Sequence, residues 1–374
     1  MATTVTGGLL RELAGFSAAN GCALSVYLDL DPSTAPTIPD VEAKFRARLA
    51  ETEKTAEGLE LDRECRLAIR NDLSRLREWW ESEFRRDGAQ GLALFASSAD
   101  GFFLALPLAC RVVDAVRIAT DLYLTPLVDQ FAHEGTLVAV VSRERGQVFR
   151  VRDGRLEELL DETEEQPGQH DQGGWSQANY RRHIDHLVAQ HLKAVGGAID
   201  RRVRGGLQMV VVCPEEMRGS FAAKLSQEAR DAIVGWTSAE AHAGPAELLQ
   251  VVRPVLDEAD ARRHEAALRR FQEELGRGGR AAGGWQETLD VAADGRVDVL
   301  LLTEGIERTL WQCPECRRAF AADGTCPVDG LALAERPDGA DVAVHLVLAG
   351  GGTVLRLGAG ALRDADDIGA LLRF

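Results

Sequence analysis

One short stretch of the chain combines residue types that can hold and hydrolyse a polar substrate: Gly173-Gly174-Trp175-Ser176-Gln177. Two adjacent glycines let the backbone adopt positive φ values and come close to a ligand. Ser176 suits the cap of a helix starting at Gln177, which would place the Gln177 amide and free backbone N–H groups at the positive helix end. Such a site can anchor a phosphate or a polar ester and order a water molecule beside it. The alternative is an ordinary surface loop that contains two glycines.

Basic residues follow the loop directly. Arg181 and Arg182 lie in the predicted helix, where they could hold phosphates near Gln177. The alternative for both is a solvated helix face. His183 and His186 are spaced to share one face of this helix, but no third ligand is near in sequence, so surface positions are favoured over a metal pair.

A second motif has the spacing of a metal site. Cys313-Pro-Glu-Cys316 is followed by Cys326-Pro-Val-Asp329, and two such turns make the two knuckles of a zinc ribbon. We predict a structural zinc site with Asp329 as the fourth ligand, and His345 as the alternative fourth ligand. The alternative is a ribbon that no longer binds metal. The remaining cysteines occur singly and predict no disulfide framework: Cys22, Cys65, Cys110 and Cys213.

The elements around these motifs predict three domains of α/β type, with mixed α+β layers. Residues 1–132 contain an alternating strand at 25–32, a long charged helical region at 40–86 and a hairpin near 100. This first domain has no chemical signature. Its acidic pair, Asp29 and Asp31, is expected to lie on a solvated strand face rather than in a metal site.

The second and third domains contain the motifs. Residues 133–257 give three short strands, the Gly-rich loop, a long helix, a continuous apolar strand and another helix, an order that predicts RNase-H-like layering. Residues 258–374 give a helix and a buried strand, two strands within 341–358 and a final apolar segment. This pattern predicts an α/β sandwich with the zinc-ribbon-like insertion at 311–331.

Composition limits the kind of protein. The chain has 374 residues, 45% of them hydrophobic and 27% charged, and its net charge is −16. Such an acidic protein does not coat nucleic acid with its whole surface, so a nucleic-acid role needs a local basic region. We expect no membrane span and no secretory signal. The cysteine usage suggests the reducing cytoplasm.

Together, the loop, the basic helix, the cysteine insertion and the ending Ile368-Gly369-Ala370-Leu371-Leu372-Arg373-Phe374 resemble a known superfamily. It is the bacterial branch of the archaeo-eukaryotic peptide chain release factors, which includes termination factors, Pelota and the ankyrin-and-zinc-finger peptidyl-tRNA hydrolases. The resemblance covers most of residues 134–374. In termination factors the loop reads Gly-Gly-Gln, whereas here Trp175 and Ser176 precede Gln177, much as in the hydrolase branch.

The resemblance implies a ribosome-associated peptidyl-tRNA hydrolase that acts in ribosome rescue or quality control. Gln177 would position the attacking water at the peptidyl-tRNA ester, which makes the activity that of a carboxylic ester hydrolase. The implied site consists of Gly173, Gly174, Ser176 and Gln177 for catalysis, and of Trp175, Arg181 and Arg182 for RNA. The implied partners are the large ribosomal subunit and the tRNA acceptor end, with delivery by a translational GTPase left open. Zinc would be structural and the location cytoplasmic.

Other functions remain open on the sequence alone. A non-catalytic ribosome-binding rescue or hibernation factor would share the fold and lack the hydrolysis. A nuclease cutting tRNA near its acceptor end would need clustered carboxylates and usually Mg²⁺. The only candidate pairs are Asp29 with Asp31 and Asp161 with Glu162. A zinc-ribbon adaptor would only bind proteins. A stop-codon reader is disfavoured, because residues 1–132 lack codon-reading motifs.

Overall fold

The computed structural model describes residues 7–19, 21–58, 61, 63–86, 89–108, 110–131, 133, 135–152, 154–161, 176–203 and 207–374; of residues 176–185 it describes the helical backbone. The chain divides into two compact units. Unit 1 combines Met1–Ala132 with His264–Phe374, and unit 2 is His133–Arg263. The predicted first domain and most of the predicted third domain, 258–374, therefore fall in one unit. Within the described ranges, no helix combines the length and apolar character that a membrane span requires.

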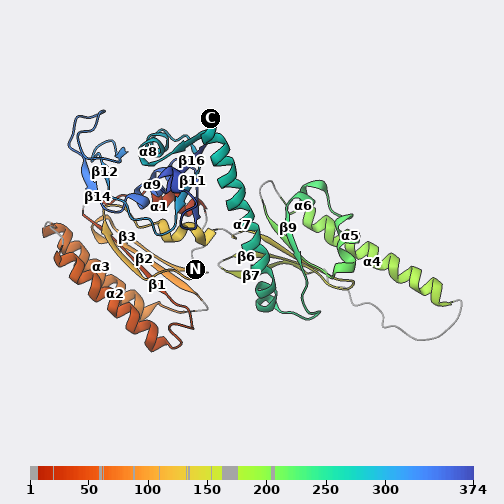
Figure 1. Ribbon diagram of the computed structural model, residues 1–374. Coiled ribbons are helices and arrows are strands. Elements are labelled where there is room, and N and C mark those ends of the chain that lie inside the picture. Colours follow the sequence, from red (N-terminus) through yellow and green to blue (C-terminus); the bar gives the residue numbers. More distant parts are fainter. Residues whose placement is uncertain are drawn as a thin grey trace. The chain divides into compact units, whose positions relative to one another are not determined.

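Unit 1 contains an antiparallel sheet with the strand order β3-β2-β1-β4. Its strands are β1 (Ala23–Asp29), β2 (Gly91–Ser97), β3 (Phe102–Leu108) and β4 (Ala115–Ala119). A helix hairpin, α2 (Ile38–Gly58) and α3 (Arg63–Ser82), covers one face (Figure 1). The apolar residues of both helices recur at helical spacing, and Phe45 stacks on Trp80 at a ring distance of 4.0 Å. The helical region predicted over 40–86 is this hairpin.

The opposite face of this sheet packs against the C-terminal part of the chain. Tyr27 and Phe95 are buried in one core with α1 (Gly7–Ala14), α8 (Trp285–Ala293) and α9 (Gly339–Ala349). Short 3₁₀ helices connect the strands and are η1 (Ser98–Asp100), η2 (Thr125–Phe131) and η3 (Arg363–Ala365). This shared core joins chain segments that the sequence suggested were separate domains.

The second sheet of unit 1 has the order β10-β16-β11-β15. Its strands are β10 (Ala281–Gly283), β11 (Val297–Thr303), β15 (Thr353–Leu357) and β16 (Ile368–Leu372). Strands β11 and β15 are parallel, whereas β16 runs antiparallel to β10 and β11. Leu300 and Leu302 face the core under α8 and α9, while Leu301 faces Phe271 of α7 (Pro245–Gly276). One expectation was wrong, because the first of the two strands predicted within 341–358 is helix α9.

Unit 2 is a five-stranded mixed sheet with the order β7-β6-β5-β8-β9. Its strands are β5 (Leu137–Val141), β6 (Gly146–Arg152), β7 (Arg155–Asp161), β8 (Met209–Val212) and β9 (Ile233–Thr237). One face buries residues of α4 (Ser176–Asp200), α5 (Glu215–Ala222) and α6 (Gln227–Asp231), and the other buries Leu248, Val252 and Leu256 of α7. The predicted order of three antiparallel strands, helix, buried strand and helix is present, and β9 adds a strand.

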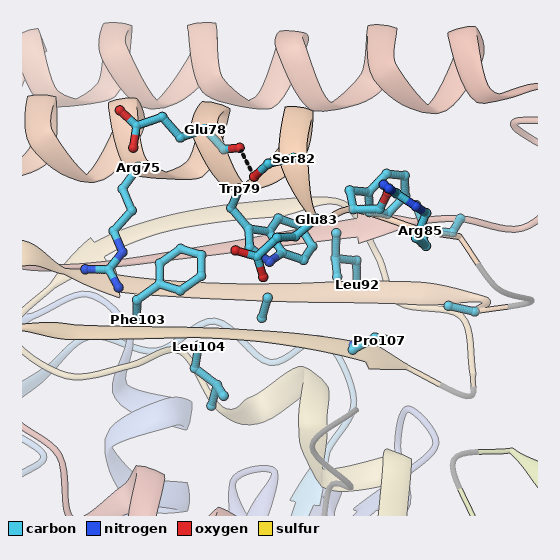
Figure 2. Close-up of a pocket in the computed structure, with 14 residues that line it drawn as sticks. Arg75, Glu78, Trp79, Ser82, Glu83, Arg85, Leu92, Phe103, Leu104 and Pro107 are labelled. Carbon is cyan, nitrogen blue, oxygen red and sulfur yellow. Dashed lines mark hydrogen bonds between the residues drawn. The ribbon is translucent and has the colours of Figure 1, made fainter. Parts of the chain in front are cut away.

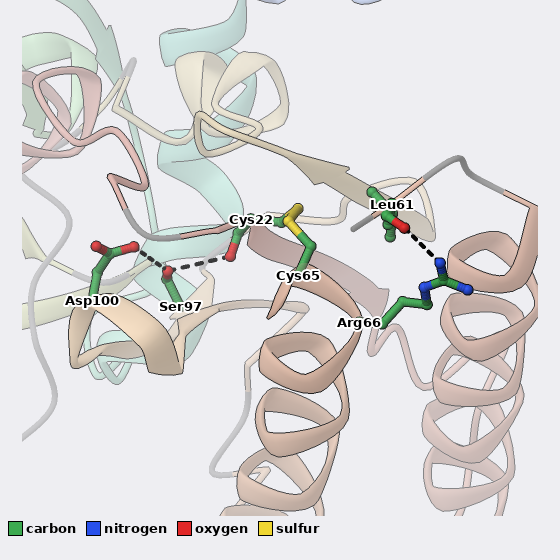
Figure 3. The surroundings of a disulfide bond; sticks show 6 residues. All are labelled: Cys22, Leu61, Cys65, Arg66, Ser97 and Asp100. Atoms are coloured by element: carbon green, nitrogen blue, oxygen red, sulfur yellow. Dashed lines mark hydrogen bonds between the residues drawn. A yellow bond between two sulfur atoms is a disulfide. The ribbon is translucent and has the colours of Figure 1, made fainter. Parts of the chain in front are cut away.

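A disulfide bond joins Cys22 and Cys65 at a Cα–Cα distance of 5.7 Å (Figure 3). This corrects the expectation that both cysteines are single. The two lie 43 residues apart in sequence, and the α2–α3 hairpin returns the chain so that the start of α3 meets the start of β1. The carbonyl of Cys22 also accepts a 3.2 Å hydrogen bond from Ser97 Oγ. Spacing alone could not reveal this pair.

Candidate functional site

The four ribbon residues converge in unit 1. The ligand atoms of Cys313, Cys316, Cys326 and Asp329 all lie within 4.8 Å of one another. Asp329 Oδ2 lies 3.1 Å from Cys313 Sγ, and the sulfurs of Cys316 and Cys326 are 3.5 Å apart. Three thiols and a carboxylate at such distances could hold a metal ion, and this is the donor chemistry that suits zinc.

Two similar turns position these ligands. In the first, the Arg317 N–H donates to the Cys313 carbonyl at 3.1 Å, and in the second the Gly330 N–H donates to the Cys326 carbonyl at 2.8 Å. Both residues adopt left-handed backbone conformations, with φ of 60° at Arg317 and 70° at Gly330. Glycine accepts this conformation readily, whereas Arg317 does so at a cost of about 1 kcal/mol. Strands β12 (Leu310–Gln312), β13 (Ala319–Phe320) and β14 (Ala334–Arg336) support the turns.

The Cys313 and Cys326 thiols lie within hydrogen-bonding distance of the Asp329 carboxylate. Hydrogen bonds from Cys316 and Cys313 lower the pKa of Asp329, and the bond to Asp329 raises the pKa of Cys316 to about 12. For Cys326, backbone N–H donors from Asp329 and Val328 outweigh burial and lower the pKa. A bound cation would replace these thiol protons, because thiolates are the ligating form. The donor set therefore fits a metal whose binding releases protons.

His345 does not belong to this cluster, which corrects its assignment as an alternative ligand. It lies on α9 and is buried, with Nε2 2.6 Å from the Leu122 carbonyl and Nδ1 3.2 Å from the Ala14 carbonyl. Both partners are acceptors, so the ring satisfies both when it is doubly protonated. The Asp341 carboxylate, 3.5 Å from Nε2, and the Leu122 carbonyl outweigh burial and raise the pKa of His345 to about 9.

A buried carboxylate ties the ribbon to the N-terminal part of unit 1. Asp121 accepts hydrogen bonds from Arg317 at 2.5 Å and from Arg336 at 2.9 Å, and its side chain is 4% exposed. We call Asp121, Arg317 and Arg336 the Asp121 clamp. Burial alone would raise the pKa of Asp121, but the bond to Arg317 and the charges of both arginines hold it below its ordinary value. Because Arg317 follows the ligand Cys316, the clamp lies directly beside the candidate metal centre.

The last two residues of the glycine-rich motif, Ser176 and Gln177, lie in the described part of unit 2. Gly173, Gly174 and Trp175 are outside the described residues, and so are the side chains of Ser176, Gln177, Arg181 and Arg182. The backbone places Ser176 as the first residue of α4 and Gln177 as the second. Further along α4, Leu192, Val195 and Ile199 are buried in the core of unit 2. The helix is thus anchored by its second half, and the roles of its first residues stay predictions.

Asp29 and Asp31 are held together by a cation. Arg111 contacts Asp29 at 2.9 Å and Asp31 at 2.8 Å, and Thr34 donates a hydrogen bond to Asp29. For Asp29, the hydrogen bonds and charge of Arg111 outweigh burial and lower the pKa. An arginine with both carboxylates occupies the place a cation would need, so this pair is an ion-pair network and not a free acidic face.

Sequence reasoning missed a groove of about 670 Å³ between α3 and strands β2 and β3 (Figure 2). Trp79 and Phe103 form its aromatic part, with ring centroids 6.3 Å apart, and the guanidinium of Arg75 lies 4.7 Å from the Phe103 centroid. Glu78 and Glu83 line the same groove. The positive charges of its arginines balance the negative charges of its glutamates, so the groove favours neither anionic nor cationic ligands. No sequence motif marks it, because its residues come from three separate elements.

Comparison with known proteins places the middle of the chain in a family. Residues 123–256 match "Bacterial archaeo-eukaryotic release factor family 10". The chain is 28% identical over 211 residues to "Peptide chain release factor subunit 1" of Methanopyrus kandleri, an alignment covering 54% of this chain and 51% of that protein. The same subunit of Archaeoglobus fulgidus is 28% identical over 208 residues, 52% of this chain and 50% of its own length. The chain thus spans about half the length of these curated relatives.

Two solved structures are also similar along much of the chain. An archaeal translation termination factor, aRF1, aligns over 99% of both chains with 17% identity and a TM-score of 0.27. The S. cerevisiae protein Dom34, described as a termination-like factor of RNA quality control that interacts with Hbs1, aligns over 75% of this chain and 77% of its own. That match has 13% identity and a TM-score of 0.41. The sequence matches confirm the predicted superfamily.

Proposed function

This chain belongs, through residues 123–256, to bacterial archaeo-eukaryotic release factor family 10, and we propose that it is a ribosome-associated peptidyl-tRNA hydrolase of ribosome rescue or quality control. The sequence relation to release factor subunit 1 supports a role in translation. The observation that carries the hydrolase activity is the Gly-Gly-Trp-Ser-Gln motif, whose glutamine is the second residue of α4. Partners would be the large ribosomal subunit and the tRNA acceptor end, with a translational GTPase as a candidate for delivery.

In this proposal unit 2 is the catalytic-loop domain, with RNase-H-like layering. Gly173 and Gly174 allow close approach to the acceptor end, and Trp175 contacts RNA. Arg181 and Arg182 follow within α4 and would neutralise nearby phosphates.

Gln177 would act on the water and not on the ester bond itself. Its amide oxygen would accept a hydrogen bond from the attacking water, and the N–H groups at the start of α4 would stabilise negative charge developing on the carbonyl oxygen. Water adds its oxygen to the carbonyl carbon, the bond to the ribose oxygen breaks, and the proton ends on the ribose hydroxyl. The products are a free peptide carboxyl group and deacylated tRNA. Positioning of this kind lowers the activation free energy by several kcal/mol, and it needs no acid or base from the protein.

We also propose that the ribbon within 311–331 binds zinc through Cys313, Cys316, Cys326 and Asp329. Zinc there supplies a structural cross-link, because four protein ligands leave no open position for a substrate. Emission spectrometry on the purified protein would detect the metal, and Cys313→Ser should abolish it. Cys110→Ser is the matched control, since Cys110 is an exposed cysteine outside the cluster. Equal metal content in the two variants would contradict the site.

The hydrolase proposal is tested by release of a labelled peptide from peptidyl-tRNA on 50S subunits. Wild-type protein should release the peptide and Gln177→Ala should not. Gln190→Ala is the matched control, because Gln190 is an exposed glutamine on the same helix. Equal release by wild type and Gln177→Ala would contradict the proposal. Stable binding without release by wild type would favour the non-catalytic rescue or hibernation factor, and cleavage of the tRNA itself would favour the nuclease.

A further inference from the structure

The topology of the second sheet of unit 1 brings three arginines to one edge. Arg296 immediately precedes β11, Arg373 immediately follows β16 and Arg280 immediately precedes β10. Strand β16 is antiparallel to both neighbours, with Leu372 opposite Val297 and Leu371 opposite Ala281, so these three strand ends meet. The start of the parallel strand β15 lies at the same edge and is preceded by the turn Gly350-Gly351-Gly352.

A fourth arginine arrives from the N-terminal part of the chain. Helix α1 packs against α9, and its Arg11 reaches the glycine turn that follows α9. A methyl group placed on Gly351 would lie 3.9 Å from Nε of Arg11 and 3.7 Å from Nη2 of Arg373. The two guanidinium groups therefore lie close to the same backbone position. We call Arg11, Arg280, Arg296 and Arg373 the arginine patch.

The polar contacts that the structure gives these guanidinium groups are to backbone carbonyls. Arg373 donates to the Gly350 carbonyl at 3.1 Å, and Arg296 donates to a backbone oxygen of Phe374, the last residue of the sequence, at 3.3 Å. Arg280 lies 3.5 Å from the Arg373 carbonyl. The carbonyl contacts of Arg280 and Arg373 fix the direction of each guanidinium but leave its charge uncompensated. Arg11, Arg280 and Arg373 are also exposed to solvent.

Carboxylates near the patch do not neutralise it. No ion pair joins any of its four arginines to an acidic side chain within the described part of the chain. Asp294 is engaged by Arg318, and Glu274 by Arg277 and by the Arg280 backbone N–H. Glu12 and Asp298 are neighbours in sequence without being partners. On a chain with a net charge of −16, this is a local concentration of positive charge with free donors.

We propose that the arginine patch binds the phosphate backbone of RNA. A guanidinium offers paired N–H donors that match phosphate oxygens, and four within one edge can engage neighbouring phosphates. The Gly350–Gly352 turn has no side chains that would hold a backbone away. Phe374 is 70% exposed beside Arg296 and offers a ring on which an unpaired base can stack, which favours RNA over an acidic protein segment. The choice of RNA rests on the proposed ribosomal function.

The test measures binding of a fluorescent RNA hairpin by anisotropy at several salt concentrations. The variant is the double reversal Arg11→Glu with Arg280→Glu, because these two side chains contribute least to the hydrogen bonding of the fold. The matched control is Arg46→Glu with Arg70→Glu, which changes the net charge equally at exposed positions of α2 and α3. We expect the patch variant to lose about tenfold or more in affinity, and the slope of log affinity against log salt to fall by about two.

Three outcomes separate the possible results. Equal binding by the patch variant and its control would overturn the proposal. Preferential binding of labelled poly-glutamate at the patch, with RNA binding unaffected by the reversal, would also overturn it and point to an acidic protein partner. The hairpin assay does not depend on Gln177, so the patch stands if the reversal abolishes RNA binding while Gln177→Ala leaves peptide release intact. In that case the hydrolase proposal fails by itself.

Discussion

Two groups of arginines in unit 1 use the same side chain for opposite purposes. In the Asp121 clamp, Arg317 and Arg336 converge on one carboxylate that is 4% exposed, and they join the ribbon to the N-terminal segment. In the arginine patch, Arg280, Arg296 and Arg373 contact backbone oxygens, and no ion pair joins a patch arginine to an acidic side chain within the described residues. The difference lies in whether the fold brings a carboxylate to the arginines. Arginines paired with a buried carboxylate hold the structure together, whereas arginines without a carboxylate partner are available to another molecule.

The largest expected effect comes from breaking the clamp. Asp121→Ala should remove the hydrogen bonds of Arg317 and Arg336 to a buried carboxylate, leave Arg336 with Asp338 as its carboxylate partner, and lower the free energy of unfolding by about 3–5 kcal/mol. Urea unfolding followed by tryptophan fluorescence would measure it. Asp366→Ala is the control, because Asp366 is 60% exposed in its pair with Arg308 and should cost under about 1 kcal/mol. Similar costs for both variants would remove the distinction between clamp and surface pairs.

The protonated side chain of His345 should make the stability of the protein depend on pH. Its pKa is raised to about 9 from an ordinary 6.5, with Asp341 and Asp121 as the charged groups that favour the cation. The resulting stability is fully present below pH 6.5 and is lost as the pH rises through about 9, and amounts to about 3 kcal/mol. Unfolding measured between pH 6 and pH 10 should show this loss in wild type relative to His345→Asn. Parallel curves for the two proteins would show that His345 is not held as a cation.

Metal occupancy should reinforce the clamp, since Arg317 follows directly after Cys316. At a free zinc concentration about a hundredfold above its dissociation constant, binding should stabilise the folded protein by about 2.7 kcal/mol. A chelator should therefore lower the melting temperature of wild type and leave Cys313→Ser unchanged. If metal binding stabilises the clamp, hydrogen exchange in residues 119–125 should also become faster on chelation. An unchanged melting temperature of wild type after metal removal would show that metal binding in the ribbon does not stabilise the clamp.

The smallest effect on stability should come from the arginine patch. Arg11→Glu with Arg280→Glu changes exposed residues without carboxylate partners, so the free energy of unfolding should stay within about 0.5 kcal/mol of wild type. Thermal unfolding at low salt would check this. A loss of several kcal/mol would mean that these arginines serve the fold, as the clamp arginines do, and would erase the contrast between the groups.

The sequence predicted features that depend on local spacing. The ribbon ligands are set by two short turns, so the Cys-Pro-Glu-Cys and Cys-Pro-Val-Asp patterns identified a cluster that the structure brings together. The order of elements in unit 2 was also readable, because the strands and helices there have distinct periodicity. The superfamily followed from the same motifs and is confirmed by the sequence matches.

Features that depend on distant pairing were not predictable. Arg336 and Asp121 are 215 residues apart in sequence. Cys22 and Cys65 come together only because the α2–α3 hairpin folds the chain back. Helix α9 was misread as a strand because Val342, Val344 and Val347 are β-branched and the helix is buried on most sides. A fully buried helix and a fully buried strand have no polar face, so periodicity cannot separate them.

The central claim is that Gln177 positions the water that releases the peptide. Its most direct test is the rate constant of peptide release from 50S-bound peptidyl-tRNA at saturating protein, with binding measured in parallel. The account predicts that Gln177→Ala binds like wild type and releases about a hundredfold more slowly. Equal release rates for the two proteins, or stable binding of wild type without any release, would contradict it.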